Sequence, residues 1–143
     1  MKQVLLDVNV LFALLFSQHE HHEIARRWAN ELSAGEAVVC RTVQFSVIRL
    51  LGNRSVVGPH AVSLSRAWAL VSKVLEDERF EFAPEPEGID EMLPRLFRCN
   101  SPALQLVADI YLAAFAIASS RRVASFDRGF VQFQGLEVEV LGV

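Results

Sequence analysis

The sequence predicts an α/β protein in which about five parallel strands form one sheet with helices on both faces. Short apolar runs alternate with longer amphipathic stretches along the chain, and strands that are separated by helices favour a parallel sheet. The chain has 143 residues, the length of one ordinary domain with a full core. We therefore expect residues 1–143 to form a single domain.

The first half of the chain begins with an apolar run from Val4 that stops at Asp7, which predicts a buried strand. Asn9 can cap a short helix over residues 10–16, whose nearly uniform hydrophobicity indicates that it is buried or lies at an interface. The periodicity then predicts a helix, a strand and two more helices, at residues 21–32, 37–40, 43–51 and 60–75. The last of these helices should point four apolar side chains inward, namely Leu64, Trp68, Val71 and Leu75.

The second half predicts three further strands and one long helix. The strands are expected at residues 80–82, 123–127 and 137–141, and the alanine-rich stretch 104–118 is strongly helical. Between them, the proline-rich segment 84–102 is the least readable part of the chain. Its apolar residues suggest one short helix.

Composition indicates a protein with partners. The chain is 52% hydrophobic with a mean hydropathy of +0.28, which suggests apolar surface reserved for a second copy or another protein, so we expect a homodimer or a bound partner. No apolar run reaches membrane-spanning length, and no signal peptide precedes the first strand, so a cytoplasmic location is expected. Cys40 and Cys99 form no metal-binding pattern and are expected to be free and at least partly buried.

The charge balance limits the mode of any nucleic-acid binding. The formal net charge is −3, which argues against a protein that coats nucleic acid through bulk charge. Arginine is nevertheless the main cation, and its planar guanidinium suits local contacts to phosphate.

Three aspartates occupy apolar settings that need explanation. Asp7 and Asp127 each end a predicted parallel strand, so their side chains should emerge at the same edge of the sheet. For either residue alone, capping a helix or starting a turn is an equally good explanation. Asp109 lies inside an apolar helical stretch, and its alternatives are a helix N-cap or a position facing water.

A divalent cation would explain a cluster of these carboxylates. Three converging negative charges repel one another, and Mg²⁺ or Mn²⁺ suits a site built from oxygen ligands. Asn9 and Ser125, each two residues from a carboxylate, could orient it by hydrogen bonds, although turn and cap duties explain them equally well. Dinucleotide, P-loop and serine-hydrolase motifs are absent from the sequence.

Five segments in order along the chain carry a family resemblance. LLDVNVLFALL, HHEIARRW, TVQFSVIRLL, DIYLAAFAIA and VASFDRGF together resemble the PIN-domain family, specifically the VapC-type toxin ribonucleases of bacterial toxin–antitoxin pairs. The resemblance implies a PIN-like (Rossmann-like) fold, cleavage of RNA that depends on Mg²⁺ or Mn²⁺, and a small antitoxin partner. It also implies that Asp7, Asp109 and Asp127 are the catalytic metal ligands. The family commonly has a glutamate in the third helix, where this chain has Gln44.

The function we expect is therefore a metal-dependent endoribonuclease. Arg128, beside Asp127, and Arg49, in the helix 43–51, could contact RNA phosphate, although either could be a plain surface charge. One alternative is a catalytically weak binding module that sequesters a protein or RNA partner, because Gln44 brings no charge. A second is a phosphatase of the haloacid dehalogenase type, for which Lys73 would be the phosphate-binding lysine.

Overall fold

A five-stranded parallel sheet forms the centre of the computed structural model, which describes residues 2–143. The sheet order is β3-β2-β1-β4-β5, and every neighbouring pair is parallel. The strands are β1 (Val4–Leu6), β2 (Ala37–Val39), β3 (Phe80–Phe82), β4 (Arg122–Ser125) and β5 (Val138–Val140). The predicted α/β class with a five-stranded parallel sheet is thereby confirmed.

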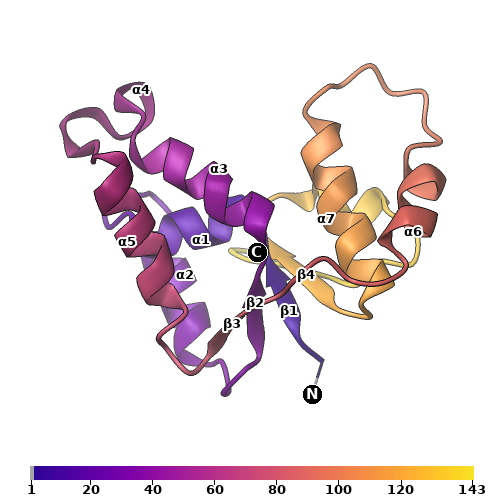
Figure 1. The fold of residues 1–143 in the computed structure, drawn as a ribbon, viewed down its shortest axis with the longest axis horizontal. Coiled ribbons are helices and arrows are strands. Elements are labelled where there is room, and N and C mark those ends of the chain that lie inside the picture. The colour runs from indigo at the N-terminus through magenta and orange to yellow at the C-terminus, as the bar shows by residue number, and fades with distance from the viewer. Residues whose placement is uncertain (1) are drawn as a thin grey trace.

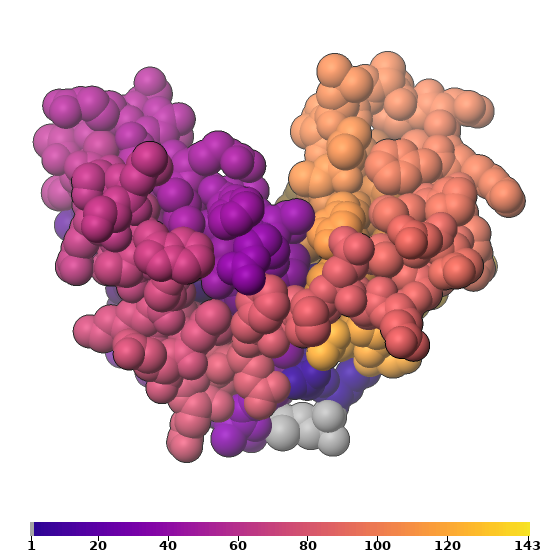
Figure 2. Space-filling model, in the orientation of Figure 1, coloured from indigo at the N-terminus to yellow at the C-terminus, as the bar shows by residue number. Residues whose placement is uncertain are grey.

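The helices form two groups on either side of this sheet (Figure 1). They are α1 (Val8–Leu15), α2 (His22–Asn30), α3 (Arg41–Leu51), α4 (Arg54–Val57), α5 (Leu64–Val74), α6 (Ile89–Leu96) and α7 (Leu106–Ala118), with the 3-10 turns η1 (Gly58–His60) and η2 (Arg128–Gln132). Helices α1 to α5 lie together, and α6 packs on α7 across from them. Figure 2 shows a hollow between the upper ends of the two groups. Within residues 2–143, no helix combines the length and the apolar character that crossing a membrane requires.

The order in which the chain adds strands to the sheet reverses beside β1. From β1 the chain adds β2 and then β3 on one side, and it returns to place β4 on the other side. Parallel α/β sheets open a crevice at such a reversal, outside the carboxyl ends of the two central strands. In this chain that crevice lies at the ends of β1 and β4.

The core is centred on β1 and α1. The three residues of β1 are fully buried, and so are Val10 and Leu11 of α1. The apolar helix predicted from residue 10 is therefore buried within its own chain. Leu14, Leu15 and Phe16 at its other end are only partly buried, so the interface that its hydrophobicity also suggested stays a prediction.

Several helices begin at other residues than predicted, because other residues cap them. Helix α1 begins at Val8, since Asp7 rather than Asn9 is its N-cap and accepts a hydrogen bond from the Val8 amide at 2.7 Å. Helix α3 begins at Arg41, directly after β2. The polar stretch before α5 contains α4 and η1, which the sequence did not predict, whereas the short helix expected in segment 84–102 is present as α6.

Two predictions of burial are wrong. Leu64 and Trp68 were expected to face the core, but they are 76% and 48% exposed, because α5 buries Ala67 and Val71 instead. The buried face of α5 is thus rotated away from Leu64 and Trp68. Cys40 is buried as expected, whereas Cys99 is exposed on the segment that follows α6.

Replacing Leu11 with alanine tests the burial of α1. Leu11→Ala should lower the free energy of unfolding by about 2–5 kcal/mol, because it leaves a cavity in a fully buried site. Leu64→Ala is the matched control, and it should change the stability by less than about 0.5 kcal/mol. Urea unfolding followed by circular dichroism measures both. Equal losses for the two variants would contradict this packing.

Candidate active site

Asp7 directly follows the carboxyl end of β1, at the point where the strand order reverses. Leu6 pairs with Ala124 of β4, and the Asp7 amide donates a hydrogen bond to the Ala124 carbonyl at 3.0 Å. The next position on β4 is Ser125, so the two strands end side by side. The Asp7 side chain is only 7% exposed, which means that its carboxylate needs polar partners inside the protein.

Ser125 is the main polar partner of Asp7. Its hydroxyl is fully buried and donates to Oδ2 of Asp7 at 2.7 Å. The Ser125 hydroxyl oxygen itself accepts hydrogen bonds from the Asp127 amide at 2.9 Å and from Nδ2 of Asn9 at 3.3 Å. Oδ1 of Asn9 in turn accepts from the Phe126 amide at 3.2 Å. The structure therefore brings Asn9 and Ser125 together with Asp7 in one network, as the sequence suggested.

Asp127 lies just beyond β4 and caps η2. Its side chain is exposed, and its Oδ1 accepts a hydrogen bond from the Gly129 amide at 2.8 Å. The capping explanation thus holds for both Asp7 and Asp127. Each carboxylate oxygen has two lone pairs, so a single hydrogen bond leaves capacity for a further ligand.

Asp109 approaches the same site from α7. It is partly buried in the first turn of this helix, and Gln105, one turn earlier, is the N-cap, so the N-cap alternative for Asp109 is wrong. Burial raises the pKa of Asp109 to about 6, with further increases from the negative charges of Asp7 and Asp127. These effects show that the three carboxylates share one electrostatic environment.

The pKa of Asp7 is also raised. Burial is the main cause, and it outweighs the opposing hydrogen bonds from Ser125 and the Val8 amide; the charge of Asp127 raises the pKa further. No cationic side chain contributes to the pKa shift of Asp7 or Asp109. The site is therefore an uncompensated cluster of negative charge.

The chemistry of this cluster suits a divalent cation, but the carboxylates are too far apart to hold one in this structure. The donors are three carboxylates without a neighbouring cation, which is the composition that Mg²⁺ or Mn²⁺ requires. Among residues 2–143, however, no three His, Cys, Asp or Glu side chains are close enough together to hold a metal ion as they stand. Binding would require the carboxylates on the β1 and β4 side and on α7 to move toward one another.

Gln44 is buried on α3, and its oxygen is already occupied. The side chain is 2% exposed, and Oε1 accepts a hydrogen bond from Nη1 of Arg41 at 2.7 Å. The Arg41 guanidinium also lies over the Phe82 ring, 4.5 Å from its centroid. Arg41 was not among the predicted site residues, although its position three residues before Gln44 on one helix face was a usable signal.

The two arginines expected to meet RNA are both exposed. Arg49 lines a cavity of about 540 Å³ between α3 and α7, together with Val8 and Tyr111. Arg128 follows Asp127 directly. In the part of the chain that the structure describes, neither arginine forms a salt bridge.

The position of Lys73 argues against the phosphatase alternative. This residue lies on α5 and lines a small cavity with Phe80, the first residue of β3. That end of β3 is at the edge of the parallel sheet opposite to the edge that carries Asp7. A phosphate held by a strand-end aspartate would be out of reach of Lys73.

Comparisons with known proteins agree on one family. A family model described as PIN domain matches residues 4–136. Ribonuclease VapC41 of Mycobacterium tuberculosis is 35% identical to this chain over 143 residues, and the match covers 96% of this chain and 98% of that protein. Ribonuclease VapC44 of the same organism is 33% identical over 128 residues, covering 88% of this chain and 87% of that protein.

Solved structures with the same fold include toxins and toxin complexes. Mycobacterium tuberculosis VapC20, described as a toxin that cleaves the sarcin–ricin loop, matches with a TM-score of 0.67 at 14% identity, over 91% of this chain and 94% of that chain. VapBC2 from Rickettsia felis, solved bound to a promoter DNA fragment, matches with a TM-score of 0.62 at 13% identity, over 96% and 98%. At these identities the likeness shows the fold alone.

The raised pKa of Asp109 predicts how stability depends on pH without added metal. The free energy of unfolding should fall as pH rises from about 4 to about 6, because the folded chain keeps a proton on Asp109 that the unfolded chain releases. Above this range both states are ionised and the loss is complete. Asp109→Asn should therefore raise the stability near neutral pH by about 1 kcal/mol, a value reduced for solvent screening.

Urea unfolding at several pH values in EDTA measures this effect, and Glu87→Gln, on an exposed loop, is the control. If Asp109→Asn and the wild type showed the same slope between pH 4 and pH 6, Asp109 would not share the charge of the cluster.

Proposed function

The chain belongs to the PIN domain family, among its VapC-type ribonucleases, and from this premise we propose that it is an endoribonuclease that depends on Mg²⁺ or Mn²⁺ and acts as the toxin of a toxin–antitoxin pair. The observation that supports the proposal is that three carboxylates near the switch in strand order are close enough for their charges to raise the pKa of Asp7 and Asp109. They come from β1, α7 and the end of β4, and no cation contributes to the raised pKa of Asp7 or Asp109. Burying negative charge in this way is unfavourable unless a positive ligand offsets it.

Each residue of the proposed site has a distinct role. Asp7 and Asp127 would hold the cation directly, and Asp109 would hold it directly or through water. When bound, the cation supplies an activated water for attack on the phosphodiester and offsets the charge that builds up on the phosphate. The Ser125 hydroxyl, held by Asn9, fixes the orientation of the Asp7 carboxylate.

Arginines at the edges of the site are proposed to hold the RNA backbone. Arg128 lies next to Asp127, and Arg49 lines the cavity between α3 and α7. Both are free of salt bridges within the described residues, so their guanidinium groups can pair with phosphate oxygens. Such contacts position RNA without reading its sequence.

The proposed protein partners are a small antitoxin and a second copy of the chain. The Rickettsia felis structure, a VapBC assembly on DNA, supports the antitoxin by analogy. Exposed apolar side chains open to these partners include Leu64 and Trp68 on α5 and Leu104 before α7.

A binding module without catalysis remains the second candidate. Gln44 stands where the family commonly has a glutamate, and its oxygen is held by Arg41, so this helix adds a positive charge rather than a negative one. Incubating the purified protein with total RNA, with Mn²⁺ and with EDTA, and mapping the new ends separates the two candidates. Discrete cuts that EDTA abolishes support the nuclease, and intact RNA under all conditions supports the binding module.

Metal binding should stabilise the wild-type protein but not the Asp7→Asn variant. At a metal concentration about 100 times the dissociation constant, the gain is about 2.7 kcal/mol, which corresponds to a rise of several degrees in Tm. Asp7→Asn removes one ligand charge. The asparagine oxygen can still cap α1, while its Nδ2 faces the Ser125 hydroxyl oxygen and can donate to it, so the variant should fold. Its RNA cleavage should fall by more than about 100-fold.

Thermal melts with Mn²⁺ and with EDTA measure the stabilisation, and Asp90→Asn on exposed α6 is the control for nonspecific metal effects. Identical melting temperatures for the wild type with and without metal would remove the basis for this site.

Gln44→Glu tests whether Arg41 keeps α3 out of the metal site. Alone, the change should leave the Mn²⁺ concentration for half-maximal cleavage nearly unchanged, because Arg41 is placed to pair with the new carboxylate. Combined with Arg41→Gln, the free carboxylate should lower that concentration by about tenfold. Arg41→Gln alone is the control. No change in the double variant would place residue 44 beyond reach of the metal.

A further inference from the structure

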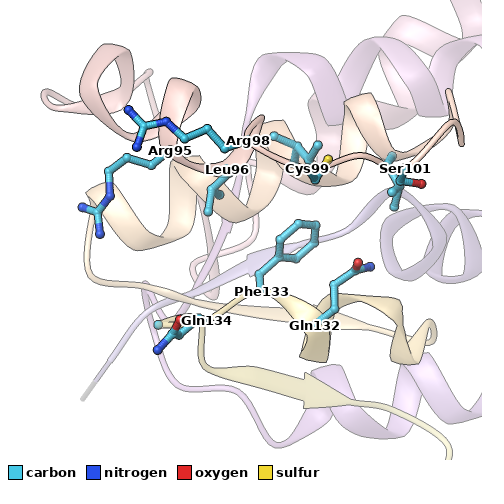
Figure 3. A pocket seen from close by; sticks show the side chains of 11 residues that line it. Arg95, Leu96, Arg98, Cys99, Ser101, Gln132, Phe133 and Gln134 are labelled. Atoms are coloured by element: carbon cyan, nitrogen blue, oxygen red, sulfur yellow. The ribbon is translucent and has the colours of Figure 1, made fainter.

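A cavity of about 550 Å³ between α6, α7 and η2 has no role in the cleavage chemistry described above (Figure 3). We call it the α6–α7 cavity, and its lining includes Arg95, Arg98, Cys99, Ser101, Gln132 and Phe133. We propose that it binds one unpaired nucleotide of the RNA, next to the bond that is cut. This inference rests on the proposed ribonuclease function and adds a substrate subsite to it.

The α6–α7 cavity shares two walls with the carboxylate cluster. Leu106 and Ile110 line it from α7, and their spacing places them on the same stripe of the helix as Asp109. Gln132 lines it from η2, the turn that begins directly after Asp127. A strand of RNA with its phosphate at the carboxylates therefore has a neighbouring nucleotide at the cavity.

The carboxylates also have a cavity on their other side. The cavity between α3 and α7 is lined by Ala108 and Tyr111, which lie on a different face of α7 from Leu106 and Ile110, and by Arg49 on α3. By its helical position Asp109 lies between the faces of α7 that line these two cavities, each of which is large enough for a nucleotide-sized ligand. This arrangement suits a single strand that passes across the site with a flank on each side.

The side chains of the α6–α7 cavity match the parts of a nucleotide. In Figure 3 the arginine side chains of Arg95 and Arg98 extend outward on one side, Gln132 and Ser101 lie toward the other side, and the Phe133 ring points up toward Leu96 and Cys99. Neither arginine forms a salt bridge with any residue from 2 to 143, so both are available for phosphate. An aromatic ring beside amide groups is how proteins stack and hydrogen-bond an unpaired base.

The amide of Gln132 is already oriented for this task. Its Nε2 donates to the Gly129 carbonyl at 2.8 Å, which leaves Oε1 free to accept a hydrogen bond from a base. Paired bases in an RNA duplex cannot reach an aromatic ring of this kind, so the cavity favours single-stranded RNA. An acidic peptide would use the arginines alone and would not need the ring or the amide.

The first test measures RNA binding without cleavage, in the Asp109→Asn background. A labelled pool of single-stranded RNA of about ten nucleotides should bind at least about tenfold more tightly than a dinucleotide pool, because only the longer RNA reaches the cavity. Arg98→Gln should weaken binding of the longer RNA by about fivefold to tenfold and lower the salt dependence by about one phosphate contact. Phe133→Leu should weaken it by about tenfold through lost stacking.

The matched control is Arg66→Gln, which removes an exposed arginine from α5, outside the helix pair that forms the cavity. It should leave the affinity for the longer RNA unchanged. Thermal melts check that Phe133→Leu folds. The proposal is overturned if length brings no gain in affinity, or if Arg98→Gln behaves like Arg66→Gln. Because binding is read without cleavage, an inactive wild type would count against the proposed function and leave this result standing.

The second test uses a reporter that the chain already contains. Cys99 is exposed and lines the α6–α7 cavity, whereas Cys40 is buried. Saturation of Asp109→Asn with the longer RNA should slow alkylation of Cys99 by N-ethylmaleimide several-fold, and the dinucleotide pool should not. Mass spectrometry of the modified peptides measures the rate, with Cys40 as the internal unreactive control. An alkylation rate of Cys99 that saturating RNA does not change would overturn the proposal.

Discussion

The burial of the Asp7 carboxylate is the constraint on which the rest of the site depends. A charge at the end of a fully buried strand loses most of its hydration, and the raised pKa of Asp7 reflects that loss. Ser125 and the Val8 amide compensate only in part. The site therefore retains unfavourable energy in the free protein, which a cation can relieve. This links the stability of the fold to the proposed chemistry, because the buried Asp7 carboxylate lowers the stability of the fold and is also a proposed metal ligand.

Capping and ligand binding are not competing explanations at this site. Asp7 caps α1, and Asp127 caps η2, and each does so with hydrogen bonds that leave lone pairs free. The caps hold each carboxylate at the carboxyl edge of the sheet, where β1 and β4 end together. The hydrogen bonds that cap the backbone thus position the Asp7 and Asp127 side chains. The buried Ser125 hydroxyl, on β4, donates to Asp7 and so connects the ends of β1 and β4. A helix cap and a metal ligand can be the same residue when the helix starts at a reversal point.

The cleft between the two helix groups decides what can reach the carboxylates. On one side α3 presents the uncharged Gln44 where the family commonly carries a carboxylate, and Arg41 of the same helix donates to the Gln44 oxygen and lies over the Phe82 ring. On the other side α7 presents Asp109 between two cavities. A negative centre with arginines around it attracts a polyanion only after the central charge is neutralised. Cation binding and RNA binding should therefore be coupled.

The sequence by itself determined the sheet, its parallel strands and the candidate carboxylates, because alternation of apolar runs and an isolated aspartate within them are local signals. Only the tertiary structure decided matters that depend on how helices rotate and pack. Helix α5 buries Ala67 and Val71 and exposes Leu64 and Trp68, since the packed face is set by its neighbours rather than by its own hydrophobicity. Likewise, the helical spacing of Arg41 and Gln44 shows that the two can meet but not that they form a hydrogen bond, and no periodicity could show that α6, α7 and η2 enclose a cavity. Those features arise from contacts between residues that are distant in sequence or from side-chain conformations that packing selects.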